Sequence, residues 1–310
     1  MIRIASALIG LVLGAQALAA VDGPFVIAET GKSYWRLDDA VNAVGDRDAT
    51  IRIAPGVYHD CAVQEAGRIA FVAAEPGKVV FDGGTCEDKA ALVLRGRGTS
   101  VDGIIFRNMR VPDANGAGIR LERGPLTVTN AMFRDSEQGI LTGDDKGATI
   151  RIDRSTFSGL GRCDRDMSCA HSIYVGHYGM LVVTRSRFER GNGGHYVKSR
   201  STRVEISDSS FDDVKGRSTN YMIDLPAGSV GTITRNMFVQ GPDKENHSAM
   251  ITVAAEARDN PSRGLSIFGN TASLAPGVSW STVFVADWSH EPLAIGANTL
   301  GKGIRTFETR

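Results

Sequence analysis

The chain has 310 residues, of which 42% are hydrophobic and 23% are charged, so it is long enough to bury a large core. Its 35 basic and 35 acidic residues give a formal net charge of zero. This balance argues against a protein that holds nucleic acid mainly through phosphate contacts, and no nucleic-acid partner is expected.

The N-terminus has the pattern of a secretory signal peptide. Arg3 precedes the apolar run 4–13, and small residues follow up to Ala20. This order predicts cleavage near residue 20, and the apolar run is too short to span a bilayer. We therefore expect a signal peptide at 1–20 and one domain at 21–310. The mature protein is expected to be periplasmic or secreted, without a membrane attachment.

Four cysteines in an exported chain predict two disulfides rather than free thiols. Three pairings exist, and sequence proximity favours Cys61–Cys86 and Cys163–Cys169. No C-x-x-C spacing occurs, so these cysteines do not predict a zinc site.

A short amphipathic helix is predicted close to the start of the mature chain. Trp35, Leu37, Ala40, Val41 and Val44 follow helical spacing, and an I-R-I strand and a P-G-V-Y turn come directly afterwards. A helix in this place would cover the open end of a stacked sheet, where an exposed strand edge invites aggregation.

The rest of the chain repeats short apolar strands separated by turns rich in Gly, Asn, Asp and Ser. Phenylalanine marks this repeat at intervals of 23 to 31 residues. No helical pattern separates the strands, so the units are not β-α-β units. The pattern predicts an all-β fold, a single-stranded right-handed parallel β-helix (a solenoid) with the phenylalanines stacked inside and the short helix as an N-terminal cap. A β-sandwich is the competing fold. The recurring residues are Phe106, Phe133, Phe157, Phe188, Phe211, Phe238 and Phe268.

Three successive repeats carry most of the polar chemistry. They read H-S-I-Y-V-G, H-Y-V-K-S-R and Y-M-I-D-L-P, and they align on Ile173, Val197 and Ile223. If these strands stack in parallel, neighbours lie ~4.8 Å apart and the residues after the aligned ones share an outward face. That outward column holds Tyr174, Lys198 and Asp224, and the column two positions before the aligned residues holds His171, His195 and Tyr221.

These motifs resemble those of a known family. The run from His171 to about Gly241 is similar to a group of exported bacterial β-helix proteins within the pectin-lyase-like superfamily, which carry I-Y-V-G, G-H-x-x-K-S-R, Y-x-I-D-L-P and Q-G-P in successive coils. The resemblance implies a β-helix over nearly the whole mature chain and an acidic polysaccharide as partner. V-K-S at Val197 is similar to the sequence around the basic lysine of relatives that resemble alginate lyase and chondroitinase B. Those relatives place an arginine in the next coil, where this chain has Asp224.

A polysaccharide lyase is the leading hypothesis for the activity. β-Elimination from a uronate needs a base for the proton next to the carboxyl group, a cation for the carboxylate, and an acid for the leaving oxygen. Lys198 or His195 is the predicted base. Arg200 would bind the carboxylate, and Tyr174 or Tyr221 would be the acid.

Other side chains nearby are expected to bind the substrate. Asp224 opposes a lysine base, because a neighbouring anion raises the pKa of a lysine, unless an arginine pairs with Asp224 instead. The tyrosines of these coils would form an aromatic edge that stacks on sugar rings. The predicted substrate-binding residues are His171, Tyr178, Tyr196, Arg217 and Asp224.

Two other functions stay open. In a non-catalytic polysaccharide-binding or cell-envelope protein, Lys198 and Asp224 would form a cross-strand ion pair and the histidines a hydrogen-bonded ladder. In a glycoside hydrolase, Asp224 and Asp145 would be the two carboxylates, although a solvated turn explains Asp144 and Asp145 better. No cofactor is expected. Calcium remains an alternative for which the sequence has no clear ligand cluster, and a monomer is expected.

Overall fold

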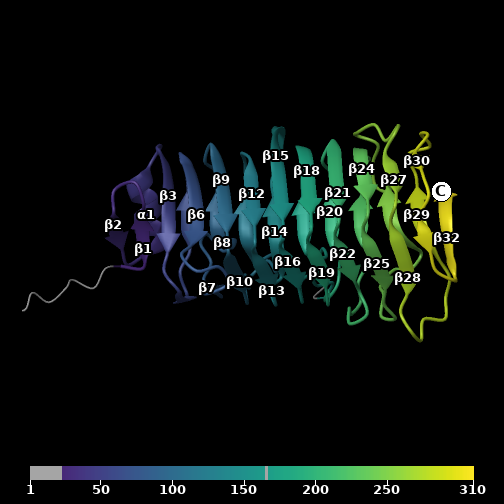
Figure 1. Cartoon of the computed structure of the whole chain (residues 1–310), viewed down its shortest axis with the longest axis horizontal. Helices are drawn as coiled ribbons and strands as arrows, with labels where there is room; N and C mark the ends of the chain where they lie inside the picture. The colour runs from purple at the N-terminus through teal and green to yellow at the C-terminus, as the bar shows by residue number, and fades with distance from the viewer. Residues whose placement is uncertain (1–22, 165–166) are drawn as a thin grey trace, which may run out of the picture.

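The computed structural model describes residues 23–164 and 167–310, so the predicted signal peptide lies outside the described residues. The chain winds into a solenoid whose strands run across its long axis (Figure 1). From strand β3 (Asp48–Ile53) onward, successive strands join sheet A, sheet B and sheet C in turn, so every third strand returns to the same sheet one coil further on. This is the predicted right-handed parallel β-helix.

The three sheets contain 12, 10 and 10 strands. Sheet A consists of β2 (Lys32–Tyr34), β1 (Phe25–Ile27), β3, β6 (Arg68–Ala73), β9 (Gly98–Asp102), β12 (Leu126–Thr129), β15 (Asp145–Asp153), β18 (Tyr178–Thr184), β21 (Arg203–Ser207), β24 (Val230–Thr234), β27 (Ser266–Phe268) and β30 (Ala294–Ile295). Sheet B consists of β4 (Gly56–Tyr58), β7 (Val79–Asp82), β10 (Ile104–Arg107), β13 (Met132–Arg134), β16 (Thr156–Ser158), β19 (Arg187–Glu189), β22 (Ser210–Asp212), β25 (Met237–Gln240), β28 (Thr271–Leu274) and β31 (Thr299–Leu300). Sheet C consists of β5 (Ala62–Gln64), β8 (Ala90–Leu94), β11 (Ala117–Leu121), β14 (Gln138–Thr142), β17 (Ile173–Val175), β20 (Val197–Ser199), β23 (Ile223–Leu225), β26 (Ala249–Val253), β29 (Thr282–Asp287) and β32 (Ile304–Thr309).

The predicted helix caps the N-terminal end of the stack. Helix α1 (Leu37–Val44) buries its apolar side against the first strands, and carboxylates on both sides of the contact fix it. The backbone N–H of Leu37 donates to Asp60 at 2.8 Å, and the N–H of Val63 donates to Asp38 at 3.2 Å. Trp35 precedes the helix and is 66% exposed, so its inclusion in the helical pattern was wrong.

The phenylalanine column lies inside the solenoid as predicted. From Phe106 to Phe238 the rings stack on one another with centroids 4.9 to 5.1 Å apart. Phe268 was wrongly included: it lies on sheet A and is 43% exposed, and Ala272 takes its place opposite Phe238. Phe284 closes the stack by packing edge-on against Phe238 at 5.4 Å.

A second ladder fixes the corner between sheets A and B. The ladder runs from Ser155 to Asn298. At each step a Ser or Asn side chain accepts a hydrogen bond from the backbone N–H of its counterpart one coil earlier, at 3.0 to 3.2 Å. These bonds hold successive turns in one register. The coils are therefore aligned both by apolar stacking inside and by polar bonds at the corner.

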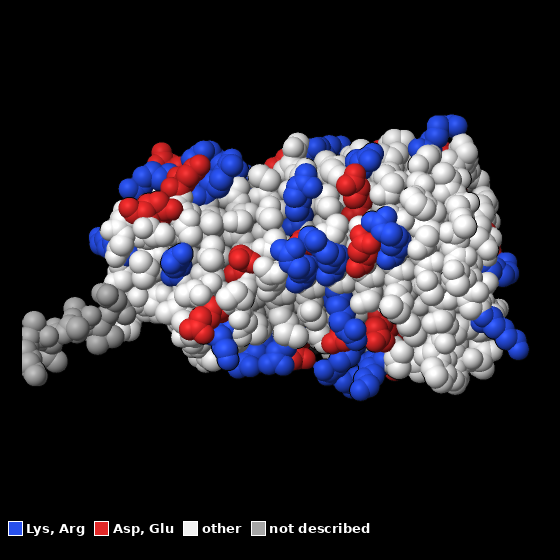
Figure 2. All heavy atoms as spheres, in the orientation of Figure 1, with Lys and Arg blue, Asp and Glu red and all other residues white. Residues whose placement is uncertain are grey.

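Both favoured disulfides, Cys61–Cys86 and Cys163–Cys169, are present. Two structural disulfides are typical of an oxidising compartment. Within the described ranges, no helix has the length and apolar character needed to cross a membrane. On the face shown in Figure 2, basic and acidic side chains lie close together over the middle of the solenoid, and most of the C-terminal third is uncharged.

The ring stack predicts a large difference between two phenylalanines. Phe157→Ala removes a fully buried ring between two others, and should cost about 3–5 kcal/mol of unfolding free energy. Phe268→Ala removes an exposed ring and should change stability by less than about 1 kcal/mol. Urea unfolding followed by circular dichroism measures both. Equal losses for the two variants would contradict the assignment of the column.

Candidate functional site

The predicted outward column of sheet C is present in the predicted register. Tyr174 on β17 pairs with Lys198 on β20, which pairs with Asp224 on β23. The row continues to Leu141 on one side and Thr252 on the other. The alternation of short strands thus brings a phenol, an ammonium and a carboxylate together on three neighbouring rungs.

Lys198 lies between two carboxylates. Its Nζ is 2.5 Å from Oε1 of Glu256 and 3.4 Å from Oδ2 of Asp224, and 12% of its side chain is exposed. Asp224 is almost fully buried, and burial raises its pKa in spite of the nearby Lys198 charge. Thr252 also donates a hydrogen bond to Oδ1 of Asp224 at 2.7 Å. The predicted cross-strand ion pair therefore exists, and a third group covers it.

That third group, Glu256, was missed by the sequence analysis. Its carboxylate accepts from Lys198 through one oxygen and from Arg200 through the other. Burial raises the pKa of Glu256, but the hydrogen bonds from the two cations outweigh it and lower the pKa to about 2. Arg200 also donates from Nε to the Tyr174 hydroxyl at 3.1 Å. Arg200 therefore pairs with Glu256 and Tyr174, and not with Asp224 as one prediction proposed.

Glu256 belongs to the loop 254–264, which follows β26 and is fastened to the preceding coils. The N–H groups of Glu256 and Ala257 both donate to the carbonyl of Pro226, at 3.0 and 2.8 Å. Asn260 donates to the carbonyl of Arg200 at 3.1 Å. The loop also carries Asp259, which contacts the His177 ring at 3.4 Å. A long repeat spacing was the signal in the sequence, but spacing alone does not show which loop residue faces the site.

The second predicted column forms a ladder of rings. His171 stacks on His195 with centroids 5.0 Å apart, and His195 stacks on Tyr221 at 5.6 Å. The backbone N–H of His195 donates to Nδ1 of His171 at 3.0 Å. Gly194 permits this approach, because its φ is 62° and a Cβ there would lie 2.7 Å from Nδ1 of His171. The G-H pair of the motif is explained by this contact.

The tautomer of His195 follows from its neighbours. Its Nδ1 lies 3.3 Å from the carbonyl oxygen of Tyr221, and a carbonyl oxygen can only accept a hydrogen bond. Nδ1 therefore carries the proton, and Nε2 of the neutral ring carries the lone pair. Nε2 lies 3.4 Å from Oδ2 of Asp224. Burial and the charge of Lys198 lower the pKa of His195 to about 3. The ring is therefore neutral at pH 7.

Three predicted substrate-binding residues lie elsewhere. Tyr178 and Tyr196 were expected to stack on sugars, but both rings are buried in the core, so this prediction was wrong. Their strands begin at Tyr178 and Val197, and the alternation that orients side chains does not extend through the turns before them. Tyr196 donates instead to the buried Asp213 at 2.7 Å. Arg217 lies in a turn before β23, where it lines a separate cavity.

The carboxylate pair of the hydrolase hypothesis is absent. Asp145 begins β15 on sheet A, three coils before Asp224 on sheet C, and it accepts backbone hydrogen bonds from Gly124 and Gly147 at 2.9 and 3.2 Å. Such bonds from nearby backbone N–H groups are typical of a turn, which is the explanation that the sequence favoured for Asp144 and Asp145. Among the described residues, the side chains grouped closely enough to hold a metal ion are Cys163, Cys169 and Glu245. Because the two cysteines form a disulfide, their thiolates are not available to a metal.

Taken together, the sheet C cluster consists of His195, Lys198, Arg200, Asp224 and Glu256. It holds two cations against two carboxylates beside a neutral imidazole. Tyr174 and Tyr221 flank it, and the Tyr221 hydroxyl accepts a hydrogen bond from Asn246 at 2.7 Å. Such a cluster can bind a carboxylate, and its neutral imidazole, with a pKa of about 3, is a weak base.

The class that this architecture defines is the right-handed parallel β-helix. No protein-family model and no curated protein matches the chain. It is similar to the solved structure of a pectin methylesterase from Aspergillus niger, with 14% identity, a TM-score of 0.49, and coverage of 90% of this chain and 87% of that one. It is also similar to ORF18 of Geobacillus virus E2, with 12% identity, a TM-score of 0.48, and coverage of 88% and 56%. The surface protein and adhesin PfbA of Streptococcus pneumoniae has 10% identity, a TM-score of 0.47, and coverage of 88% and 94%.

The environment of His195 predicts an unusual titration. The ring should stay neutral between about pH 8 and pH 5, whereas a histidine in the unfolded chain titrates near ~6.5. Because the folded pKa is the lower one, the stability contributed by the neutral ring is complete above ~6.5 and is lost as the pH falls toward 3. Nitrogen chemical shifts of the ring, measured by NMR, test the first point. A midpoint close to 6.5 in the folded protein would contradict the assignment.

Proposed function

We propose that this chain binds an acidic polysaccharide along the outward face of sheet C, with Lys198 and Arg200 holding the carboxylate of a uronate residue. One observation carries the proposal: the two oxygens of Glu256 accept hydrogen bonds from these two cations. Cations that are placed to bind one carboxylate through both oxygens have the donors that a second carboxylate needs. Glu256 sits on a loop, so a uronate could replace it without a change in the coils.

The position of Lys198 favours binding over base catalysis by this residue. Its Nζ forms ion pairs with Asp224 at 3.4 Å and with Glu256 at 2.5 Å, so it already acts as an anion-binding cation. Lys198 is therefore suited to hold an anion. The two disulfides support an extracellular or periplasmic location, where such polysaccharides occur.

A second candidate function is cleavage by β-elimination, with the neutral ring of His195 as the base. Because the pKa of this ring is about 3, bound substrate would have to raise it for the ring to act as a base at pH 7. Its Nε2 lone pair would take the proton next to the carboxyl group, the carbon–oxygen bond to the leaving sugar would break, and a carbon–carbon double bond would form. The Tyr174 hydroxyl accepts from Arg200, so its own proton remains available for the leaving oxygen. In this version His195 is the base, Lys198 and Arg200 neutralise the carboxylate, and Tyr174 is the acid.

The affinity for uronate polymers should fall when a cation, Lys198 or Arg200, is removed, and should rise when the Glu256 carboxylate is removed. Lys198→Gln and Arg200→Gln should each weaken binding of polygalacturonate or alginate about tenfold, because each removes a charged hydrogen bond. Glu256→Gln should strengthen binding several-fold, since the internal competitor loses its charge. Calorimetric titration measures the affinities, and Lys78→Gln, which changes an exposed lysine on another face, is the matched control.

A purely structural cluster would behave differently. Glu256→Gln would then lower the melting temperature without raising the affinity for any uronate polymer. That outcome would overturn the proposal.

Cleavage has a separate test. Incubation with uronate polymers, with calcium and with a chelator, should generate ultraviolet-absorbing unsaturated ends if the protein is a lyase. His195→Gln should then reduce the rate by about 10²–10⁴-fold while binding persists, because only proton transfer is lost. Binding without unsaturated ends would leave the first proposal standing and exclude the second. New reducing ends without this absorbance would indicate hydrolysis instead.

A further inference from the structure

A cavity outside the sheet C cluster lies over the turns that connect sheet B to sheet C. Its volume is about 420 Å³, within the range of ligand sites in proteins. Five successive coils contribute to it, through the turns after β10, β13, β16, β19 and β22. Since neighbouring rungs lie ~4.8 Å apart, four intervals span roughly 19 Å along the solenoid axis. The cavity is thus an elongated groove that suits a linear molecule of several units.

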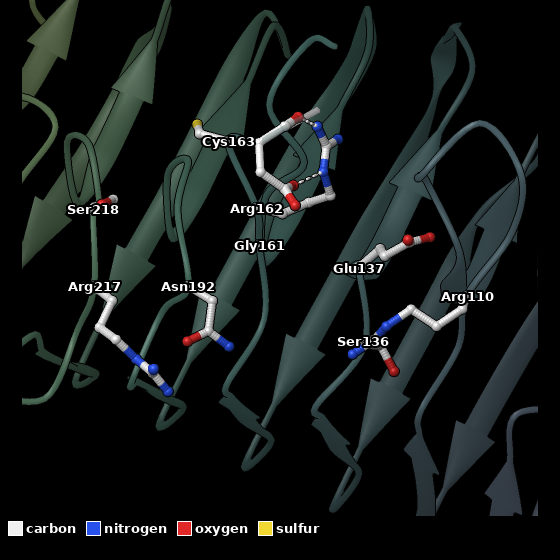
Figure 3. A pocket seen from close by; sticks show the side chains of 10 residues that line it. Arg110, Ser136, Glu137, Gly161, Arg162, Cys163, Asn192, Arg217 and Ser218 are labelled. Carbon is white, nitrogen blue, oxygen red and sulfur yellow. Dashed lines mark hydrogen bonds and ion pairs between the residues drawn. The ribbon is translucent and has the colours of Figure 1, made fainter. Parts of the chain in front are cut away.

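The two ends of the groove carry arginines. Arg110 follows β10 at one end, and Arg217 precedes β23 at the other. Figure 3 shows both guanidinium groups directed toward the middle of the groove, with Ser136 and Asn192 between them. Within the described part of the chain, neither arginine forms an ion pair, and Arg110 donates a side-chain hydrogen bond to the carbonyl of Met109.

The other charged groups of the groove are held by the protein itself. Arg162 is buried and donates to Asp164 at 2.5 Å and to the carbonyl of Ser168 at 3.0 Å. One oxygen of Glu137 accepts from the backbone N–H groups of Val111 and Gly116. Among the residues that the structure describes, the positive charges directed into the groove are therefore those of Arg110 and Arg217, and Gly161, Arg162 and Cys163 form one wall.

From this geometry we infer that the groove is a second binding site, for a linear acidic oligosaccharide that places one anionic group at Arg110 and another at Arg217. Serine, asparagine and glycine between the arginines suit a hydroxyl-rich chain. The residues lining the groove include no aromatic ring on which a nucleic-acid base could stack. The ligand class follows from the proposed function, whereas the site does not use any residue of the sheet C cluster.

Calorimetric titration with tetragalacturonate tests the inference, with maltotetraose as the uncharged probe. The double variant R110Q/R217Q should weaken binding about 100-fold, because about tenfold is lost for each arginine. The double variant R36Q/R52Q makes the same change of charge at exposed positions near the N-terminal cap and should bind like the unchanged protein. Maltotetraose should bind at least tenfold more weakly than tetragalacturonate.

The double variant K198Q/R200Q separates this inference from the proposed function. If both sites exist, R110Q/R217Q and K198Q/R200Q each weaken binding of polygalacturonate. If only R110Q/R217Q weakens it, the groove stands and the sheet C site falls; if only K198Q/R200Q weakens it, the groove falls. Equal affinity for polyglutamate would overturn the assignment to a sugar, and no change of affinity in R110Q/R217Q would overturn the groove itself.

Discussion

The register of the coils is the constraint on which the other features depend. A strand of three residues, such as β17 or β20, has too few hydrogen bonds and too little apolar surface to hold its place alone. Its position is set by the phenylalanine stack inside the solenoid and by the Ser/Asn ladder at the corner between sheets A and B. A slip of one residue would turn Lys198 into the core and Val197 toward solvent, and the cost of that exchange keeps the outward row intact.

Register explains which parts of the site were predictable. Aligned apolar residues at Ile173, Val197 and Ile223 were enough to place Tyr174, Lys198 and Asp224 in one row, because alternation within a strand is a local property. The ring ladder was predictable from the alignment of the coils, because residues at equivalent positions of stacked coils are neighbours. Tyr178 and Tyr196 were misplaced because they stand where a turn meets a strand, and a turn reorients the chain by its backbone angles, which residue spacing does not encode.

Glu256 shows the second limit. It reaches Lys198 from a loop two strands later in sheet C, across 58 residues of sequence, and no periodic pattern relates the two. The partner of a charged residue in a solenoid comes from whichever inserted loop folds back over that rung. Sequence reasoning could state that Lys198 and Asp224 oppose each other, and it left the conflict between a lysine base and a neighbouring anion unresolved. The loop resolves it, because it places a second carboxylate against Lys198 and holds the lysine in ion pairs with both Asp224 and Glu256.

The late position of Glu256 also affects how the molecule is assembled. A solenoid that forms coil by coil from its N-terminal cap would complete β17, β20 and β23 before the loop 254–264 is available. During that interval Lys198 and Arg200 would face solvent with Asp224 as the nearest anion, and an external carboxylate could reach them without competition. The last coils would then close over cations that are already in place. In this order of assembly, the anion site is first open to an external carboxylate and is later occupied by Glu256.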